Sequence, residues 1–285
     1  MTPERPTRIE RGALEGGRWE TATREPCALL RSHVRSLVGF DERTPRPDSR
    51  RQFPEPFVVV VIEFEPSLRV TLGGDARTTA RHAGGFTAGL GDSFAITEHD
   101  GRQRGIQVDL TPTGARRLFG IPLSALADQI VSLADLLPQE TRALAERLDA
   151  STDWGSRLDL VESLLARRIL GAQVDTSRVD RALARIESCA GRLELGSLAD
   201  ELGCSHKHLI ALFHDQVGVA PRRFARLVRF ERVMRDARAR ADARWADLAL
   251  AHGFSDQAHL ARDVKRFTGL TPTEARGDSS ALGPR

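Results

Sequence analysis

The stretch LADELGCSHKHLIALF at residues 198–213 has the same pattern as LALAHGFSDQAHLARDVKRF at residues 248–267. Each begins with a short apolar segment, bends at a glycine, and continues as a second segment with apolar residues at helical spacing. The glycines Gly203 and Gly253 are fifty positions apart, and so are Ser205 and Ser255. A glycine bend between two short amphipathic helices is typical of a helix-turn-helix motif, whose second helix can enter the DNA major groove. The sequence therefore predicts tandem motifs and a regulator of transcription.

The distribution of charge supports a polyanionic partner for this part of the chain. Residues 205–270 contain thirteen Arg or Lys against seven Asp or Glu, while the rest of the chain has 29 basic and 32 acidic residues. A basic region on a near-neutral body is typical of one domain that binds nucleic acid, although a single run of charge would be read as solvated surface.

The boundaries of the C-terminal helices carry recognisable signals. Pro221 is expected to begin a long helix that extends to about residue 239. About eighteen residues of helix span roughly 27 Å, which suits a strut between two recognition helices about 34 Å apart along DNA. Side chains that can cap a helix N-terminus are expected at Ser197, Ser205, Ser255 and Thr271.

The two recognition helices present different polar side chains. Gln pairs bidentately with adenine and Arg with guanine, so the strongest candidates for reading bases are Gln257 and Arg262. Other basic side chains are expected to touch phosphates, which position the protein without specifying sequence. The full set of base-reading candidates is Ser205, His206, Lys207, Gln257, His259 and Arg262, and the phosphate candidates are Arg222, Arg223, Arg226, Lys265 and Arg266.

The N-terminal part is predicted to be rich in strands. Residues 1–50 are expected to be irregular, and residues 57–64, 68–72, 84–91, 93–97 and 105–110 to form short strands bounded by Gly or Asp. Closely spaced strands of this kind favour a small antiparallel sandwich or barrel. Helices are expected at 112–119, 123–127, 139–148 and 154–170. The stripe Leu158, Val161, Leu165 and Ile169 in the last helix is expected to be core, with a dimer seam as the alternative.

The C-terminal motifs resemble the AraC/XylS family of bacterial transcription activators. The run GFSDQAHLARD at 253–263, followed by GLTP at 269–272, matches the second motif of that family, and the residues from Leu198 to Pro221 match the first. The resemblance covers about 100 residues and implies a seven-helix domain that binds two successive major-groove segments. Two positions depart from it: Ala211 replaces a frequent Arg, and Ala220 replaces a small hydroxyl residue. The first departure leaves Lys207 to carry base reading by the first recognition helix.

The resemblance also implies an N-terminal domain that senses a small molecule or mediates dimerisation. The expected fold is α+β, with an N-terminal cupin-like β-sandwich or barrel followed by helices, and an all-α C-terminal domain with two helix-turn-helix motifs joined by a long helix. The expected divisions are 1–170 for the sensor or dimerisation domain, 171–177 for a linker, 178–277 for the DNA-binding domain and 278–285 for a polar tail.

An effector pocket in the N-terminal domain would be built from its strands. The candidate lining residues are Phe57, Phe64, Phe86 and Phe94, with core filling as the alternative. The acidic residues Glu63, Glu65, Glu98 and Asp109 lie on strand-like segments, where they face either a cationic ligand or water, and the sequence leaves this open. His82 and His99 lack the paired spacing of a metal site, so neither a metal nor a cofactor is expected.

Other features limit the class of protein. Three widely spaced cysteines, Cys27, Cys189 and Cys204, favour reduced thiols in the cytoplasm, and no apolar run is long enough to span a membrane. An enzyme is the weaker reading because no catalytic triad, phosphate loop or metal triad appears outside the C-terminal domain. A constitutive, architectural DNA-binding protein without a ligand stays open. The expected partners are double-stranded DNA, a small-molecule effector and, for an activator, RNA polymerase; homodimerisation is undecided.

Overall fold

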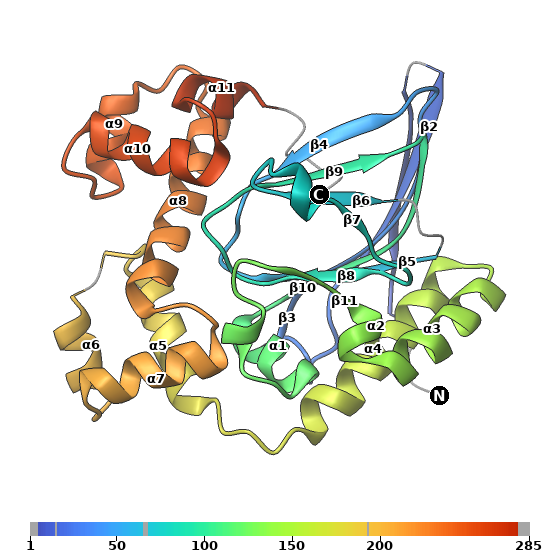
Figure 1. The fold of residues 1–285 in the computed structure, drawn as a ribbon, viewed down its shortest axis with the longest axis horizontal. Coiled ribbons are helices and arrows are strands. Elements are labelled where there is room, and N and C mark those ends of the chain that lie inside the picture. Colours follow the sequence, from blue (N-terminus) through green and yellow to red (C-terminus); the bar gives the residue numbers. More distant parts are fainter. Residues whose placement is uncertain (1–4, 15, 65–67, 193, 279–285) are drawn as a thin grey trace.

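The computed structural model describes residues 5–14, 16–64, 68–192 and 194–278. Its N-terminal part contains two β-sheets with helices packed beside them, and its C-terminal part is helical (Figure 1). The predicted α+β fold, with a sheet-rich N-terminal domain and an all-helical C-terminal domain, is confirmed. None of the helices in these ranges is long and apolar enough to cross a membrane.

The larger sheet is antiparallel and has β10 near its centre, paired with β3 on one side and β5 on the other. Side chains alternate between its two faces. On β10, Ile106 and Val108 are fully buried against helices, whereas Gln107 and Asp109 are half-buried on the opposite face. In spatial order the strands are β1 (Arg8–Leu14), β2 (Gly17–Arg24), β3 (Val34–Arg43), β10 (Arg102–Leu110), β5 (Val58–Glu63), β8 (Phe86–Ala88) and β11 (Ile130–Ser132).

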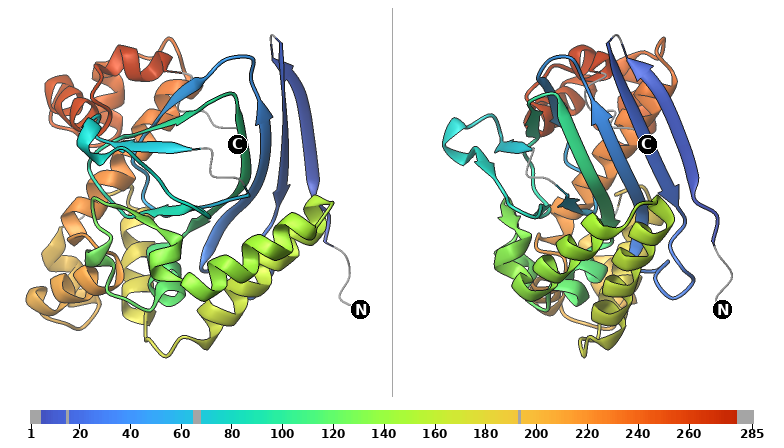
Figure 2. Two further views of the ribbon diagram at one scale, coloured as in Figure 1. Left: turned by 45° about the vertical axis from the view of Figure 1, so that its right-hand side comes forward. Right: turned by 90° about the vertical axis from the view of Figure 1, so that its right-hand side faces the viewer.

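The smaller sheet faces the second side of the larger one, so that the two sheets enclose an interior (Figure 2). Its strands are, in spatial order, β4 (Asp48–Gln52), β9 (Ala95–His99), β6 (Arg69–Leu72) and β7 (Ala80–Arg81), with the short 3-10 helix η1 (Ala76–Thr78) between β6 and β7. This arrangement agrees with the sandwich or barrel predicted from the strand spacing.

The prediction that residues 1–50 are irregular was wrong, because they contain β1, β2, β3 and the start of β4. The sequence RIERGAL of β1 and GRWETATR of β2 lacks the dense β-branched pattern that marks β5. These strands are stabilised by pairing instead: β1 pairs with β2, β2 with β3, and β3 with β10. Charged side chains are typical of strands at the edge of a sheet, where they discourage pairing with another chain.

Helices α1 to α4, which come after β10 in the chain, cover the outer face of the larger sheet (Figure 2). They are α1 (Pro112–Phe119), α2 (Leu133–Leu136), α3 (Pro138–Ala150) and α4 (Trp154–Gly171), and the helix predicted at 123–127 is a 3-10 turn, η2 (Leu123–Ala125). The stripe Leu158, Val161, Leu165 and Ile169 on α4 is at most 3% exposed and packs in one cluster with the sheet. The stripe is therefore core, as predicted, and not a seam left for a second chain.

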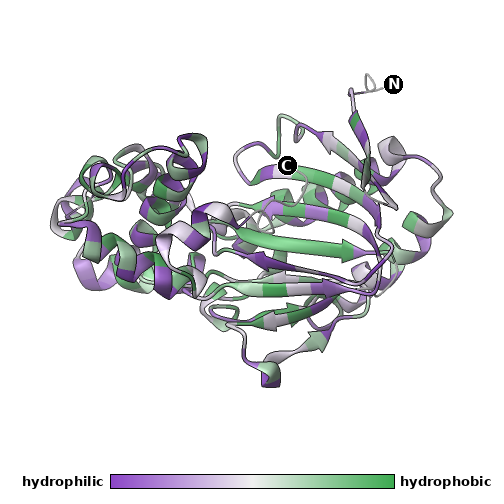
Figure 3. Cartoon of the chain, turned by 90° about the horizontal axis from the view of Figure 1, so that it is seen from above, coloured by the Kyte–Doolittle hydropathy of each residue, from purple (hydrophilic) through white to green (hydrophobic). Residues whose placement is uncertain are grey.

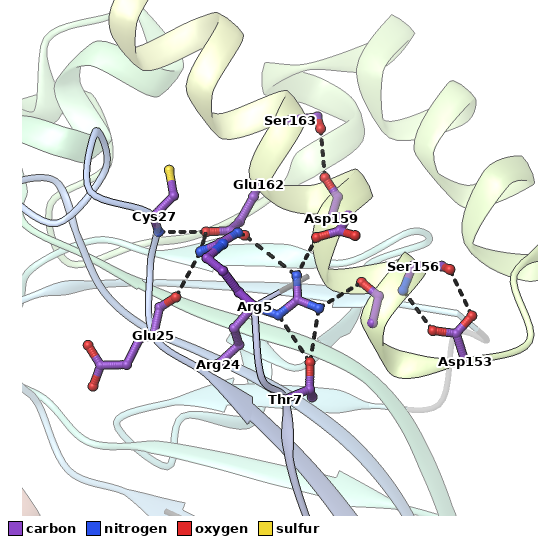
Figure 4. Close-up of polar contacts among 11 residues, drawn as sticks. Arg5, Thr7, Arg24, Glu25, Cys27, Asp153, Ser156, Asp159, Glu162 and Ser163 are labelled. Carbon is purple, nitrogen blue, oxygen red and sulfur yellow. Dashed lines mark hydrogen bonds and ion pairs between the residues drawn. The ribbon is translucent and has the colours of Figure 1, made fainter. Parts of the chain in front are cut away.

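Helix α4 is fixed to the end of β2 by a buried network of charges (Figure 4). The guanidinium of Arg24, whose side chain is 2% exposed, contacts the carboxylate of Asp159 and donates to the carbonyl oxygen of Gly155 at 3.1 Å. The carboxylate of Glu162, 6% exposed, is paired with Arg5 and accepts a hydrogen bond from the backbone N–H of Cys27 at 2.9 Å. Each buried charge thus has an opposite charge beside it, as burial requires.

The C-terminal part consists of α5 (Ser177–Ser188), α6 (Leu195–Glu201), α7 (His206–Gln216), α8 (Pro221–Ala239), α9 (Trp245–Ala251), α10 (Gln257–Thr268) and α11 (Pro272–Gly277). Apolar and polar residues alternate along these helices (Figure 3), and the apolar ones form the core between them. Helix α8 has 19 residues and a rise of about 28 Å. It connects the α6–α7 pair to the α9–α10 pair (Figure 1).

Candidate DNA-binding surface and ligand cavity

The first helix-turn-helix consists of α6 and α7, joined at Gly203, whose φ of +61° places it in the left-handed region that favours glycine. Ser205 is the N-cap of α7, as predicted, and its hydroxyl accepts a hydrogen bond from the backbone N–H of His208 at 3.2 Å. Leu209 and Phe213 are fully buried, whereas Ser205, His206 and Lys207 are exposed. The three base-reading candidates of this motif therefore lie on its solvent side. Ala211, where the family often has Arg, is exposed as well.

The second helix-turn-helix has the same construction, with α9 and α10 on either side of Gly253. Its N-cap is Asp256, so the prediction of Ser255 was wrong by one residue. The Asp256 carboxylate accepts a hydrogen bond from the backbone N–H of His259 at 2.6 Å, and this bond holds the pKa of Asp256 below its usual value. The prediction of Ser197 as an N-cap was also wrong, because α6 begins at Leu195 after an uncapped Glu194.

Helix α10 has a buried apolar face and an exposed polar face, as a recognition helix requires. Leu260, Val264 and Phe267 are fully buried, and Gln257 and Arg262 are exposed. His259 is half-buried because its ring packs edge-on against Phe254, with 5.3 Å between ring centroids. Base reading by these residues stays a prediction, and the geometry favours Gln257 and Arg262 over His259.

The five phosphate candidates lie in different environments. Arg222 and Lys265 are exposed. Arg226 is ion-paired with Asp263 at 3.2 Å, and its guanidinium lies 5.6 Å from the centroid of the Phe267 ring. Such a side chain supports the packing of α8 on α10, and its contact with a phosphate stays a prediction.

Arg223 on α8 and Arg266 on α10 both contact the N-terminal domain. The two guanidiniums share the carboxylate of Asp92, with 2.8 Å between Arg223 Nε and Asp92 Oδ1, and Arg223 also contacts Asp128. Burial alone would lower the pKa of Arg223, but hydrogen bonds to Asp128 and Asp92 raise it above its ordinary value. In this arrangement both cations are paired with carboxylates of the sheet domain, and contact of either with a phosphate stays a prediction. The sequence contained no signal for these pairs.

Both motifs are docked on the sheet domain at further points. Arg51 donates to the carbonyl oxygen of Thr268 at 3.0 Å, and its guanidinium lies 4.1 Å from the centroid of the Phe94 ring. On the side of the first motif, Arg116 is paired with Asp215 at 3.2 Å. The structure therefore holds the DNA-binding surface against the N-terminal domain at both of its ends.

A cavity of about 530 Å³ lies between the two sheets. This volume is within the usual range of small-molecule sites, about 300–1,000 Å³. Phe57 and Phe86 line the cavity. The prediction that Phe64 and Phe94 line it is corrected, because Phe64 packs against Trp154 and the guanidinium of Arg157 outside it, and Phe94 lies under Arg51 at the domain contact.

The DNA-binding domain contributes to the wall of this cavity. Glu231 and Arg238, both on α8, are among its lining residues. The guanidinium of Arg238 lies 5.0 Å from the centroid of the Phe53 ring, and Phe53 packs edge-on against Phe230 with 6.3 Å between centroids. A molecule inside the cavity would therefore be bordered by α8 as well as by the strands.

The structure shows different environments for the acidic residues whose orientation the sequence left open. Asp109 faces the cavity, Glu98 is paired with Arg69 at 3.9 Å, and Glu63 accepts a hydrogen bond from the backbone N–H of Leu68 at 2.9 Å. Glu65 lies outside the described residues.

One group of side chains has the composition of a metal site. Oxygen and nitrogen atoms of Glu42, Asp48 and His99 lie within 4.8 Å of one another. The guanidinium of Arg50 contacts both carboxylates, and Gln103 donates to Glu42 at 2.7 Å. Burial lowers the pKa of His99 below its ordinary value. Because Arg50 already supplies the counter-charge, the donor set does not fit a divalent cation.

In comparison with known proteins, the N-terminal and C-terminal parts of the chain match different families. Residues 198–278 match the family described as a helix-turn-helix domain, and residues 22–132 match a domain of unknown function, DUF6597. An uncharacterised helix-turn-helix-type transcriptional regulator of Staphylococcus aureus strain MSSA476 is 37% identical over 90 residues, which are 32% of this chain and 12% of that protein. The chain thus matches only a small part of the length of its curated relatives.

Among solved structures, unsaturated fatty acid-bound ToxT of Vibrio cholerae superposes with a TM-score of 0.47 at 8% identity, covering 92% of this chain and 100% of ToxT. The AraC-like transcriptional activator CuxR superposes with a TM-score of 0.33 at 16% identity, covering 80% of this chain and 86% of CuxR. The C-terminal part of the present chain is a helix-turn-helix DNA-binding domain. It is of the AraC type, the family that its two motifs resemble in sequence.

Proposed function

We propose that the whole chain is a sequence-specific transcription regulator whose binding to DNA responds to a small molecule held between the two sheets. The observation that carries the proposal is the position of α8. This helix separates the two recognition helices and also borders the cavity through Glu231 and Arg238. A molecule in the cavity would therefore contact the element that sets the spacing of the DNA-reading surfaces.

In the proposed complex, α7 and α10 enter successive major-groove segments. Gln257 and Arg262 would read adenine and guanine through bidentate hydrogen bonds, with Lys207 as the main reader of the first motif. We call the arrangement in which Arg223 and Arg266 are paired with Asp92 closed, and the one in which they have left it open. Arg222 and Lys265, which are exposed, would contact phosphates in the closed arrangement, and Arg223 and Arg266 only in the open one.

The proposed division of the chain follows its helices. Residues 1–170 would form the sensor domain, 171–177 the linker, 178–277 the DNA-binding domain and 278–285 a tail, of which residues 279–285 lie outside the described ranges. Helix α4 ends at Gly171 and α5 begins at Ser177, so the two ends of the proposed linker lie in helices and residues 172–176 connect them without helix or strand. The partners in this proposal are double-stranded DNA, the effector and, for activation, RNA polymerase, and the setting is the cytoplasm.

The experiment that tests the proposal is selection of bound fragments from genomic DNA by the purified full-length chain, with and without an extract of cell metabolites. A shared motif of two short blocks about ten base pairs apart is expected, since that spacing is one turn of DNA. Enrichment that changes with the extract would support the effector. Binding without a shared motif would instead indicate an architectural DNA-binding protein, and a motif indifferent to every extract would remove the effector from the proposal.

A further inference from the structure

The face of the sheet domain that lines the cavity carries both apolar and polar side chains. Half-buried apolar side chains such as Val38, Phe40 and Val59 line the cavity together with Gln107 and Asp109. On the opposite face of the same strands, Val60, Ile106 and Val108 are at most 3% exposed and form the core with the helices. On the inner face, Val61, Leu68, Val70 and Phe86 are at most 6% exposed and form a second, smaller apolar cluster, and the polar groups of this face border the open space beside it.

Acidic groups outnumber basic groups along the cavity wall. Its carboxylates are Glu20, Glu42, Glu55, Asp109, Asp128 and Glu231, and its guanidiniums are Arg35, Arg50 and Arg238. Among the residues that the structure describes, neither Lys nor His lines the wall. Four of these carboxylates are paired with arginines, three of them outside the wall, so the count alone does not set the charge of the cavity. An anionic ligand placed against Asp109 would be repelled, which costs free energy in a partly desolvated site.

The guanidiniums of the wall are already engaged by the protein. Arg35 is paired with Glu187 at 3.2 Å and lies 5.3 Å from the centroid of the Phe57 ring. Arg50 is paired with Glu42 and Asp48, and Arg238 lies against the ring of Phe53. To bind an anion, the site would have to break one of these contacts first.

Asp109 differs from the other carboxylates of the wall. Four of them are paired with an arginine: Glu20 with Arg11, Glu42 with Arg50, Asp128 with Arg223 and Glu231 with Arg235. Asp109 accepts hydrogen bonds from two neutral donors, Ser36 Oγ at 2.6 Å and Gln107 Nε2 at 2.8 Å. Within residues 5–14, 16–64, 68–192 and 194–278 it forms no ion pair. The two donors fix the carboxylate in place on β10 without neutralising it.

The surroundings of Asp109 are apolar on the cavity side. Its cross-strand neighbour on β5 is Val59, and Phe57 precedes that strand in the same wall. A fixed negative charge next to aromatic and β-branched surface is complementary to a cation attached to an apolar body, since the ring face also attracts positive charge.

We infer that the cavity binds an apolar organic monocation, such as an aryl-alkyl ammonium, with its charged group against Asp109. The inference rests on the proposed function, in that it names the class of the effector. The ammonium donates to the carboxylate oxygens, whose other lone pairs remain occupied by Ser36 and Gln107, and the apolar body fills the space between Val38, Val59 and Phe57.

The test uses three probes that share one body and differ in charge: 4-phenylbutylammonium, 4-phenylbutanol and 4-phenylbutyrate. Binding to the full-length chain is measured by calorimetry at neutral pH. The ammonium is expected to bind about tenfold more tightly than the alcohol, as one charge-assisted hydrogen bond allows, and the carboxylate more weakly than the alcohol. The variant Asp109→Asn should remove the preference for the ammonium and leave the affinity for the alcohol unchanged.

The control is Glu146→Gln, which makes the same chemical change at an exposed position of α3. It should retain the full preference for the ammonium. Equal binding of the three probes, tighter binding of the carboxylate, no binding of any probe at millimolar concentration, or an unchanged preference in Asp109→Asn would each overturn the inference.

Measuring DNA affinity in parallel separates this inference from the proposed function. If the ammonium binds with the expected preference and DNA affinity does not change, the ligand class is supported and the effector response fails. If the alcohol binds as tightly as the ammonium and DNA affinity changes, the effector response is supported and the cationic class is overturned.

Discussion

Replacing Asp92 with Asn should strengthen the binding of this protein to DNA. Asp92 is the carboxylate on which Arg223 and Arg266 converge, and its side chain is 9% exposed. The variant Asp92→Asn keeps the shape of the side chain and removes its charge. Arg266 then loses its counter-charge on the sheet domain, and Arg223 keeps only the more exposed carboxylate of Asp128.

The size of the effect follows from the exposure of the two pairs. The arginine side chains are 27% and 54% exposed, so each pair contributes about 1 kcal/mol after screening by solvent. Together the pairs favour the closed arrangement by about 2 kcal/mol, which is roughly thirtyfold in the equilibrium between closed and open states. Two arginines released to phosphates should also steepen the dependence of log affinity on log salt concentration by about two units, since each contact contributes about 0.9.

Fluorescence anisotropy with a random-sequence duplex, repeated over a range of salt concentrations, measures both quantities. The matched control is Asp100→Asn, which removes a carboxylate paired with Arg81 on the sheet domain, so it has the same effect on net charge. The control should show a small gain in affinity without the change in slope. If Asp92→Asn and Asp100→Asn have the same affinity and the same salt slope, Asp92 does not restrain the DNA-binding surface and the reasoning is refuted.

Four further substitutions test other contacts. Arg262→Ala should weaken binding to a selected site by about 1–3 kcal/mol and relax the preference at one base, while Lys265→Ala should weaken all duplexes alike; competition binding that finds the two variants equal would contradict the assignment. Ala220→Ser should raise the free energy of unfolding by about 1 kcal/mol, because α8 has no side-chain N-cap; unchanged chemical denaturation would disprove this. Glu162→Gln should lower the free energy of unfolding by about 3 kcal/mol by leaving Arg5 and Arg24 without their shared buried partner, and a loss below about 1 kcal/mol would mean that the network is screened.

The elements that could be predicted from sequence are those whose signal is local. The glycine bends at Gly203 and Gly253 and the β-branched run of β5 each determine their conformation within a few residues. Pro221 marks the start of α8 for the same reason. The N-cap of α10 was misplaced because Ser255 and Asp256 are adjacent and both can accept from a free backbone N–H, and only the backbone path selects Asp256.

The contacts that could not be predicted depend on pairing across long separations. Strands β1 and β2 have no apolar pattern of their own and form because β3 and β10 offer hydrogen bonds. Asp92 lies in a Gly-Asp-Ser sequence that resembles an ordinary turn, and its partners Arg223 and Arg266 are more than 130 residues away. The orientation of Asp109 was open for a similar reason, because the face it occupies depends on the register of β10.

Helix α8 has a consequence for how this chain can diverge. A substitution at Glu231 or Arg238 alters the wall of the cavity, yet the same turns of helix carry the core residues Phe230, Val233 and Ala237 that hold the two DNA-reading pairs in position. A mutation of α8 that changes ligand preference can therefore also change the spacing of the two recognition helices, and with it the DNA sites that the protein binds. Substitutions that change ligand preference should therefore occur mainly on the strand side of the cavity, at positions such as Val38 and Val59. These residues do not belong to the helices that hold the DNA-reading pairs.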